Sequence, residues 1–318
     1  MKANTKQSKI VTILLATQPK FLTASISPVL VGTGLGVAVA GSFQPLLFIL
    51  ALLAIAALHI GSNMNNDYFD HLSANDWLNK NPTPFSGGSR FIQKGLLTPK
   101  EMLITGLAFL GIGSVIGITI VLLTKSVFIL ILGLAGLLGG FFYTASPLRL
   151  GYRRVGELNI ALLFGFLPVY GAYYLQTKTT DSFVLLPAAI VAILIFLVIL
   201  INEFPDLPAD AAVNKRTWPV CLGVTVSIWI YRIILITAYL LALAALFLNR
   251  LFFFSGLLFM LTLPLAYMTL RFANKKNLTT NKECRANQLT ILLHLTGSIA
   301  LTAGFIISAM QNNIEITV

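Results

Sequence analysis

Charged residues are scarce in this 318-residue chain, where they make up 10% of the positions, against roughly 25% in an ordinary soluble domain. Hydrophobic residues make up 57% of the chain, and the mean hydropathy is +0.85. A soluble enzyme of this composition would expose too much apolar surface, and a disordered chain would have the opposite bias. The composition therefore excludes both classes and indicates an integral membrane protein.

Cysteine is also scarce, since Cys221 and Cys284 are the two in the sequence. Neither has a local pairing motif, which argues against a disulfide framework and against a thiolate metal site. Basic residues outnumber acidic ones and the net charge is +11. The basic residues lie beside hydrophobic segments, where they orient a membrane chain, so we expect no nucleic-acid partner. The start of the chain lacks a small-residue cleavage pattern, and we expect no cleavable signal peptide.

Apolar runs separated by polar or Gly/Pro clusters predict an all-α, polytopic membrane bundle of about nine transmembrane helices. The runs lie near residues 21–40, 45–62, 102–123, 127–143, 156–175, 183–202, 233–249, 251–271 and 289–309. The apolar but interrupted stretch 218–231 is expected to form a short interfacial helix. We expect one membrane domain over residues 1–318, with two pseudo-repeated halves at roughly 21–143 and 156–309.

The charges predict an orientation in the cell (inner) membrane. With the N-terminus in the cytoplasm, 19 of the 22 Lys and Arg residues fall inside, and Lys125, Lys178 and Arg250 fall outside. This split is what the positive-inside rule selects. The acids divide in the same way, with Asp181 and Glu315 outside. The inner set includes four residues near the chain start and in a late loop: Lys2, Lys6, Lys282 and Glu283. The functional face is therefore expected in the cytoplasm and the C-terminus outside.

Acidic residues gather where two predicted spans enter the cytoplasm. The second span runs into Asn66, Asp67 and Asp70, with Asp76 six residues further on. On a continuing helix, Asp67 and Asp70 share a face, as do Asn66 and Asp70. The spacing predicts that these side chains act together at the helix end.

The sixth span ends in a second acidic pattern. Asn202, Asp206 and Asp210 recur every four residues and would align on one helical face, although Pro205 and Pro208 predict an irregular helix. Both patterns lie at helix C-termini, where the macrodipole favours cations.

Carboxylates beside a membrane core repel one another and lose hydration, so they need a compensating partner. Oxygen ligands without neighbouring His or Cys favour a hard cation, and Mg²⁺ commonly completes its shell with substrate phosphates. Two such clusters facing each other would hold Mg²⁺ on a diphosphate. The alternative is that both are solvated loop acids.

Basic residues follow each acidic cluster. Arg90 comes after a Gly87-Gly88-Ser89 turn, Lys215 follows the second cluster, and Arg153 lies in the next inner loop. Arg and Lys suit phosphate oxygens, and a glycine-rich turn lets backbone N–H groups approach an anion. The alternative is that these are orientation charges alone.

On these residues the chain resembles the UbiA superfamily of intramembrane prenyltransferases. It most resembles the branch of 1,4-dihydroxy-2-naphthoate polyprenyltransferases, which make menaquinone precursors. The resembling stretches are SPVLVGTGLG (27–36), NDYFD (66–70), GGSRFIQKGLLTP (87–99), YTASPLRLGYRRVGE (143–157) and INEFPDLPADAAVNKRTWPV (201–220). The chain departs from the branch at residues 203–205, Glu-Phe-Pro in place of Asn, an aliphatic residue and Arg, and at Gly151 in place of Lys.

The resemblance implies an enzyme that moves a polyprenyl group from a polyprenyl diphosphate to an aromatic acceptor, most closely dihydroxynaphthoate. The implied Mg²⁺ ligands are Asp67, Asp70, Asp206 and Asp210. The implied diphosphate-binding residues are Asn66, Arg90, Arg153, Asn202 and Lys215. Asp76 and Arg90 are the expected catalytic residues, Asp76 by positioning or deprotonating the acceptor. The lipid bilayer is the expected surrounding, and no protein partner is predicted.

Two alternatives remain at this point. Intramembrane acids at repeated positions also mark ion-coupled secondary transporters, although acids at the inner helix ends with basic residues beside them suit a diphosphate better. Within the enzyme class, the acceptor could instead be homogentisate, 4-hydroxybenzoate or a lipid or haem precursor.

Overall fold

The computed structural model describes residues 8–279 and 284–316. Some of the charged residues that the sequence places on one side of the membrane lie outside these described residues. They are Lys2, Lys6, Lys282 and Glu283, together with the side chain of Glu315. Within the described part the chain is helical and contains no strand, which confirms the predicted all-α class.

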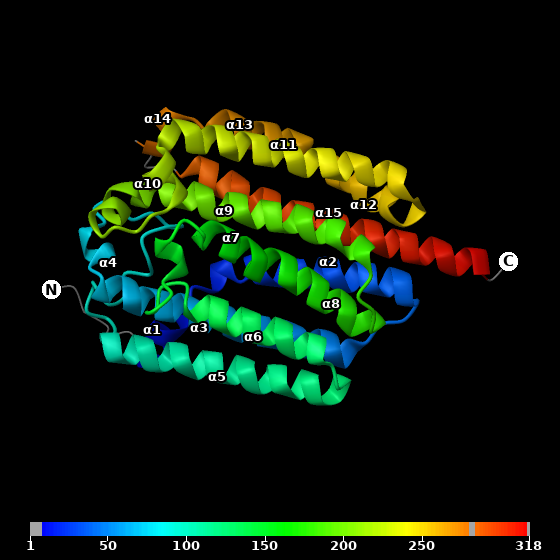
Figure 1. Ribbon diagram of the computed structural model, residues 1–318, viewed down its shortest axis with the longest axis horizontal. Helices are drawn as coiled ribbons and strands as arrows, with labels where there is room; N and C mark the ends of the chain where they lie inside the picture. The colour runs from blue at the N-terminus through cyan, green and yellow to red at the C-terminus, as the bar shows by residue number, and fades with distance from the viewer. Residues whose placement is uncertain (1–7, 280–283, 317–318) are drawn as a thin grey trace.

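The helices follow one another along the chain with short connections. They are α1 (Lys9–Ala16), α2 (Thr23–Ala40), α3 (Pro45–Leu72), α4 (Asn75–Leu78), α5 (Pro99–Thr124), α6 (Val127–Phe141), α7 (Gly156–Ala161), α8 (Leu167–Thr177), α9 (Leu185–Ala212), α10 (Trp218–Leu222), α11 (Val224–Leu248), α12 (Arg250–Met260), α13 (Leu263–Phe272), α14 (Lys275–Thr279) and α15 (Arg285–Ile316). A π-helical segment, Leu162–Phe166, joins α7 to α8. The long helices lie side by side in one bundle (Figure 1).

Seven of the described helical runs are long and apolar enough to cross a membrane, which makes this a multi-pass membrane protein. They are Thr23–Ala40, Pro45–Leu72, Pro99–Thr124, Gly156–Thr177, Ser182–Ala212, Val224–Leu248 and Arg285–Gln311. The pair α12 and α13, bent by 47°, is an eighth candidate, and α6 is a shorter apolar helix of 15 residues. The predicted count of nine is therefore not confirmed and stays a prediction, as does the division into two halves.

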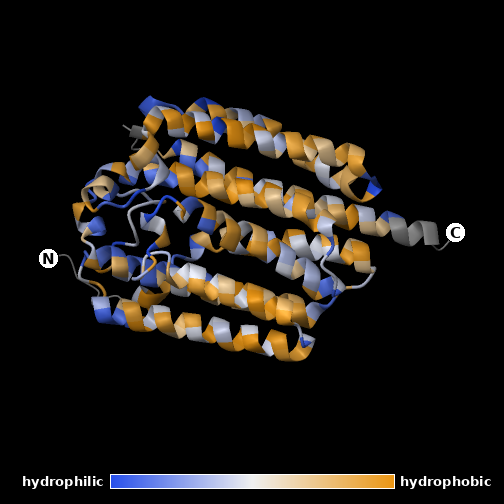
Figure 2. Cartoon of the chain, in the orientation of Figure 1, coloured by the Kyte–Doolittle hydropathy of each residue, from blue (hydrophilic) through white to orange (hydrophobic). Residues whose placement is uncertain are grey.

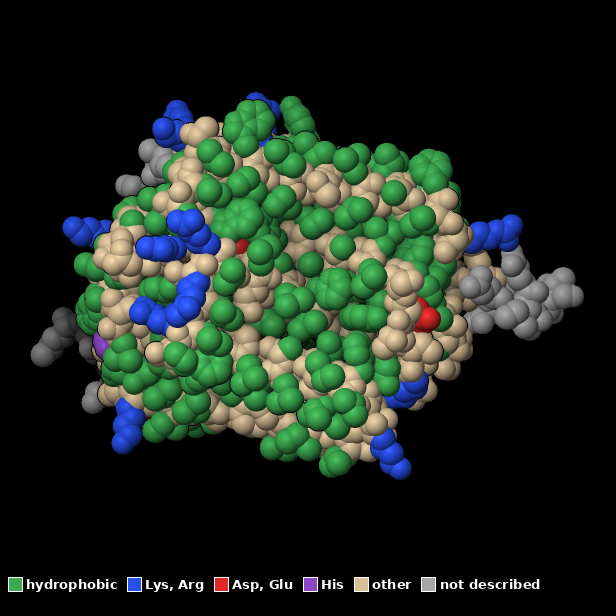
Figure 3. Space-filling view, viewed as in Figure 1, with side chains coloured by type: hydrophobic (Ala, Val, Ile, Leu, Met, Phe, Trp, Pro, Cys, Tyr) green, Lys and Arg blue, Asp and Glu red, His purple; other side chains and the backbone are tan. Residues whose placement is uncertain are grey.

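Hydrophobic residues cover the middle of the bundle and hydrophilic ones gather at its ends (Figure 2). The space-filling view shows the same division, with a broad apolar belt and Lys and Arg side chains toward both ends (Figure 3). The cations predicted to lie outside, Lys125, Lys178 and Arg250, sit at the α5–α6, α8–α9 and α11–α12 connections.

The two helices that carry the acidic motifs are longer than the sequence predicted. Helix α3 continues through the first acidic motif to Leu72, and α9 continues through Pro205 and Pro208 to Ala212. The expected irregularity at these prolines does not interrupt the helix. Both acidic motifs are consequently helical.

One boundary was predicted wrongly. The short helix α10 ends at Leu222, and α11 already begins at Val224, so residues 224–231 belong to the long helix and not to an interfacial one. Gly223, at φ 80°, separates the two helices. This left-handed backbone conformation suits glycine, and it provides the break that hydropathy did not locate.

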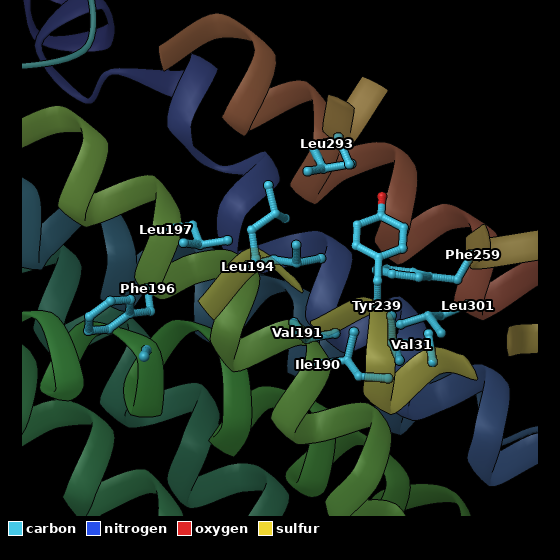
Figure 4. Packing of buried hydrophobic residues seen from close by; sticks show 14 of the residues in the cluster. Val31, Ile190, Val191, Leu194, Phe196, Leu197, Tyr239, Phe259, Leu293 and Leu301 are labelled. Carbon is cyan, nitrogen blue, oxygen red and sulfur yellow. The ribbon is translucent and has the colours of Figure 1, made fainter. Parts of the chain in front are cut away.

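The largest apolar core lies between α2, α9, α11, α12 and α15. Figure 4 shows Leu194 and Leu197 of α9 on the side of Leu293 of α15, and Tyr239 beside Phe259. The rings of Tyr239 and Phe259 are 5.0 Å apart between centroids. This packing fixes α9 at the centre of the bundle, which in turn fixes the position of the second acidic motif.

Candidate active site

The C-terminal turns of α3 carry the first acidic motif into the molecule. Asp67 and Asp70 are both buried. Asn66 Nδ2 donates to Asp70 Oδ2 at 3.3 Å, which is the four-residue spacing expected on one helical face. These three side chains line one cavity at this end of the bundle.

The C-terminal turns of α9 carry the second motif to the same cavity. Asn202, Asp206 and Asp210 all line it. Asn287 of α15, which is buried, donates to Asn202 Oδ1 at 2.8 Å and to the backbone carbonyl of Ile201 at 3.0 Å. A third helix therefore orients Asn202.

Lys215 joins the two motifs. Its Nζ lies 3.2 Å from Asp70 Oδ2 on one side and 3.7 Å from Asp210 Oδ1 on the other. Burial alone would lower the pKa of Lys215, but the facing carboxylates of Asp70 and Asp210 together raise it well above its usual value. Lys215 therefore stays an ammonium and partly neutralises both carboxylates.

The loop between α4 and α5, together with α4 itself, covers the second motif. Asn75 Nδ2 donates to Asp210 Oδ1 at 2.9 Å, and Asn79 Nδ2 donates to Asp206 Oδ1 at 2.7 Å. The backbone N–H of Gly87 donates to the other Asp206 oxygen at 3.0 Å. These bonds hold the carboxylates in defined orientations.

The same loop reaches the first motif through its glycine-rich turn. The backbone N–H of Ser89 lies 3.2 Å from both oxygens of Asp67. Gly88 adopts φ +70°, and a Cβ on it would lie 2.6 Å from Asp76 Oδ2 and 3.1 Å from Asp67 Oδ1. Glycine is required here because both the backbone conformation and the close approach exclude a side chain.

Asp76 also lines the cavity and is buried. Gln93 Nε2 donates to Asp76 Oδ2 at 3.3 Å, and Arg90 Nη1 donates to the Asp76 backbone carbonyl. Burial raises the pKa of the Asp76 carboxyl to about 9, and the negative charges of Asp70 and Asp67 add to that effect.

Two of the predicted phosphate-binding cations do not face the cavity. Arg153 is exposed and its Nη2 donates to the Pro147 carbonyl at 2.9 Å, so its expected contact with the diphosphate stays a prediction. The Arg90 guanidinium is engaged with the Asp76 backbone, and Arg90 borders a neighbouring hollow instead. Arg90 also adopts a left-handed backbone φ of 65°.

Sequence reasoning missed Tyr152 as a site residue. Its hydroxyl donates to Asp70 Oδ1 at 3.0 Å and lies 2.9 Å from Ser73 Oγ. The Arg149 guanidinium lies 3.8 Å from the centre of the tyrosine ring. Tyr152 is buried, and in the sequence it lies between Arg149 and Arg153. An aromatic residue between two arginines was the signal that could have identified it.

The cavity has a volume of about 230 Å³. Of the described residues that line it, one is a cation, Lys215, and six are acids: Asp67, Asp70, Asp76, Glu203, Asp206 and Asp210. One ammonium cannot balance these six carboxyl groups, five of which are buried, and oxygen donors select hard cations. The donor set therefore fits Mg²⁺.

No three His, Cys, Asp or Glu side chains in the described part come close enough to hold a metal ion by themselves. The carboxylates are divided among three helices, α3, α4 and α9. A metal at this site would need further oxygens, and water and phosphate supply them in many Mg²⁺ sites.

The fold and the site together define a multi-pass membrane protein whose functional groups gather at one end of a helical bundle. The chain belongs to the UbiA prenyltransferase family, which matches residues 25–309. It is a prenyltransferase, as its relatives in this family are named.

Two bacterial relatives are similar over most of the chain. The chain is 32% identical over 254 residues to a Haemophilus influenzae protein named 1,4-dihydroxy-2-naphthoate octaprenyltransferase, covering 78% of this chain and 80% of that protein. An Escherichia coli protein of the same name is 31% identical over 264 residues, covering 81% and 83%.

A solved structure has the same fold. It is a UbiA homolog from Archaeoglobus fulgidus bound to DMAPP and Mg²⁺, with a TM-score of 0.63 and 16% identity, covering 92% of this chain and 99% of that one. At this identity the likeness shows the fold alone.

Proposed function

We propose that this protein transfers a polyprenyl group from a polyprenyl diphosphate to 1,4-dihydroxy-2-naphthoate and requires Mg²⁺. The names of the two bacterial relatives support the acceptor. The DMAPP and Mg²⁺ bound to the archaeal homolog support the donor class and the metal.

The observation that carries the proposal is the meeting of both acidic motifs in one cavity, with Lys215 between Asp70 and Asp210. A diphosphate brings at least two negative charges, so it needs cations between itself and these acids. We propose that four of the cavity carboxylates hold Mg²⁺: Asp67, Asp70, Asp206 and Asp210.

Mg²⁺ bound there would stabilise the leaving diphosphate as a Lewis acid. Lys215 would exchange part of its contact with Asp70 and Asp210 for phosphate oxygens, to which an ammonium donates strong hydrogen bonds. Asn66 and Asn202 lie beside these carboxylates and would donate to the same phosphate group. The leaving group would thus be bound by residues of α3, of α9 and of the segment that follows α9.

Beyond the acids, the cavity walls are apolar and aromatic, with Tyr143, Phe164 and Ile195 among the lining residues. Such walls keep water from an allylic cation that forms as the C–O bond breaks. The aromatic faces stabilise positive charge. An electron-rich carbon of the acceptor then attacks the cation.

With dihydroxynaphthoate, the carboxylate would leave as CO₂ once the ring carbon has attacked, and we propose that Asp76 positions the acceptor or takes up the proton of its ring hydroxyl during the attack. Its raised pKa favours the protonated form in the metal-free protein, and cations bound beside it would lower that pKa and free the carboxylate. Arg90 would serve by holding the Asp76 backbone in place.

We place the protein in the cell (inner) membrane, with the active site and N-terminus cytoplasmic and the C-terminus outside. The split of 19 inner to three outer cations supports this orientation. The end of the bundle that carries α4 and α10 is then the cytoplasmic one (Figure 1).

The test is incubation of membranes carrying the protein with labelled polyprenyl diphosphate, Mg²⁺ and a panel of acceptors. The panel contains dihydroxynaphthoate, homogentisate and 4-hydroxybenzoate. We expect Mg²⁺-dependent alkylation of dihydroxynaphthoate. Alkylation of another acceptor alone would refute the proposed acceptor, and no alkylation at all would refute the reaction.

A further inference from the structure

Glu203 is a buried carboxyl group for which the proposed chemistry has no use. It lies on α9, three residues before Asp206, and is 6% exposed. It lines the same cavity as the two acidic motifs. No backbone N–H, amide, hydroxyl or cationic group of the described residues donates a hydrogen bond to either of its carboxyl oxygens.

The polar neighbour of this side chain is another carboxyl group. Glu157 of α7, itself 1% exposed, lies within hydrogen-bonding range of Glu203, and two carboxyl groups can share one proton but leave their remaining oxygens without a donor. The Oε1 atom of Glu157 already accepts the backbone N–H of Trp218 at 2.6 Å. The cation of the cavity, Lys215, is engaged by Asp70 and Asp210.

A buried carboxyl group without a partner is unfavourable, since its transfer from water is not compensated. In a binding cavity, the missing partner is a donor group on a ligand. Neither part of a polyprenyl diphosphate provides one, because the tail is hydrocarbon and the ionised diphosphate only accepts hydrogen bonds. The hydroxyl of a phenolic acceptor does provide one.

We propose that Glu203 binds a hydroxyl group of the aromatic acceptor and thereby selects and orients it. This inference rests on the proposed prenyl transfer. Glu203 lies about one helical turn from Asp206, so a ring anchored there lies next to the diphosphate site. Tyr143, Phe164 and Ile199 line the cavity with it and provide walls for a flat ring.

The charge of the pocket also sets which way the ring points. Glu203 and Glu157 together disfavour a carboxylate at this position, because like charges in a low dielectric repel strongly. A hydroxynaphthoate would therefore bind with a hydroxyl toward Glu203 and its carboxylate turned away. Aromatic acceptors without a hydroxyl would bind poorly.

The first experiment measures the steady-state constants for acceptor and donor in the wild type and in Glu203→Met. The methionine side chain has a similar volume to glutamate but is a much weaker hydrogen-bond acceptor. We expect kcat/KM for the acceptor to fall by about tenfold or more, with the donor KM within about twofold of wild type. Leu207→Met is the matched control, since Leu207 is on the same helix and does not line the cavity. It is expected to behave as wild type.

A second measurement uses the two mono-methyl ethers of the acceptor and so separates binding from a merely structural role. In the wild type, one ether should be used about tenfold less well than the parent. In Glu203→Met, the same methylation should change kcat/KM little, because the carboxyl group that binds this hydroxyl is already absent. If Glu203→Met fails to fold, Glu203→Gln provides the test, with an acceptor KM raised by about threefold or more.

An unchanged acceptor kcat/KM, an equal loss for donor and acceptor, or additive effects of variant and ether would each overturn the inference. These outcomes presuppose that the wild type alkylates an acceptor. If the wild type alkylates none while still binding the labelled diphosphate with Mg²⁺, the proposed function itself fails, and the role of Glu203 fails with it.

Discussion

At the scale of single residues, the best-defined contact of the site is the one from Tyr152 to Asp70. The tyrosine hydroxyl donates to Asp70 Oδ1, and Lys215 approaches the other oxygen of the same carboxylate. Arg149 stacks on the ring and limits its movement. If Asp70 binds Mg²⁺, the hydrogen bond from Tyr152 orients the Asp70 carboxylate toward the metal.

Tyr152→Phe should raise the Mg²⁺ concentration needed for half-maximal activity by about tenfold or more, as loss of such supporting partners does at other metal sites. The measurement is a Mg²⁺ titration of prenyl transfer. Tyr239→Phe is the control, because it removes a hydroxyl that bonds Thr262 at 2.6 Å away from the cavity. Equal Mg²⁺ dependence in both variants would contradict a role for Tyr152.

The raised pKa of Asp76 predicts how the stability of the folded protein depends on pH. Burial raises its pKa to about 9 in the folded protein, whereas a free aspartate titrates near 3.9. The folded state therefore binds this proton more tightly than the unfolded state. Stability from this group is fully present below about pH 4, and it is lost as the pH rises toward about 9.

Melting temperatures measured in EDTA between pH 6 and pH 10 test this expectation. The wild type should lose stability as the pH rises to about 9 and then level off, and Asp76→Asn should lose less over the same range. Parallel curves for the two proteins would show that Asp76 does not titrate as its burial implies.

The sequence could predict that the acidic residues lie together because their spacing is helical. Asn66, Asp67 and Asp70 line the cavity together with Asp206 and Asp210. It could not predict that Arg153 points away from the cavity, because the direction of a loop side chain depends on tertiary contacts that spacing does not encode. It missed Asn287 for a related reason, since that residue acts from α15, far away in sequence.

At the scale of elements, the loop from α4 to α5 connects the two motifs. Gly87 reaches Asp206 and Ser89 reaches Asp67, so the glycine-rich turn lies between α3 and α9. The sequence predicted a turn whose N–H groups meet an anion, and in this structure the anions are carboxylates of the protein itself. A diphosphate would have to share or displace these donors.

Gly88→Ala should lower activity by about tenfold or more, because the new Cβ would lie 2.6 Å from Asp76 Oδ2. Gly95→Ala is a matched control: its φ is +65°, close to that of Gly88, but nothing lies within 4 Å of the added Cβ. Both variants carry a backbone strain of about 1 kcal/mol, and Gly88→Ala has the close approach to Asp76 in addition, so its melting temperature should fall further. Activity that falls alike in both would contradict the assigned role of the turn.

The places of the apolar helices were predicted better than their lengths. Hydropathy ended the predicted spans at residues 62 and 202, yet α3 and α9 continue for about ten residues into polar sequence. Those extra turns are held by hydrogen bonds from the covering loop, which hydropathy cannot register. The four proposed Mg²⁺ ligands, Asp67, Asp70, Asp206 and Asp210, all lie on these extensions.

At the scale of the whole molecule, the acidic motifs lie at one end of an apolar bundle, and the chain crosses the bundle repeatedly (Figures 1 and 2). This arrangement follows from composition, because few charges are present and most must lie at the ends. The pseudo-repeat of two halves remains a prediction, motivated by the similar patterns around Asn66 and Asn202.

The central claim is that α3 and α9 together bind one diphosphate. Its most direct test is Mg²⁺-dependent binding of a labelled, non-reactive allylic diphosphate analogue to the wild type, Asp67→Asn, Asp206→Asn and the double variant. We predict one analogue per chain, about tenfold or greater weakening in each single variant, and a double effect smaller than the product of the two. Unchanged binding in either single variant, or independent effects of the two, would contradict a shared site.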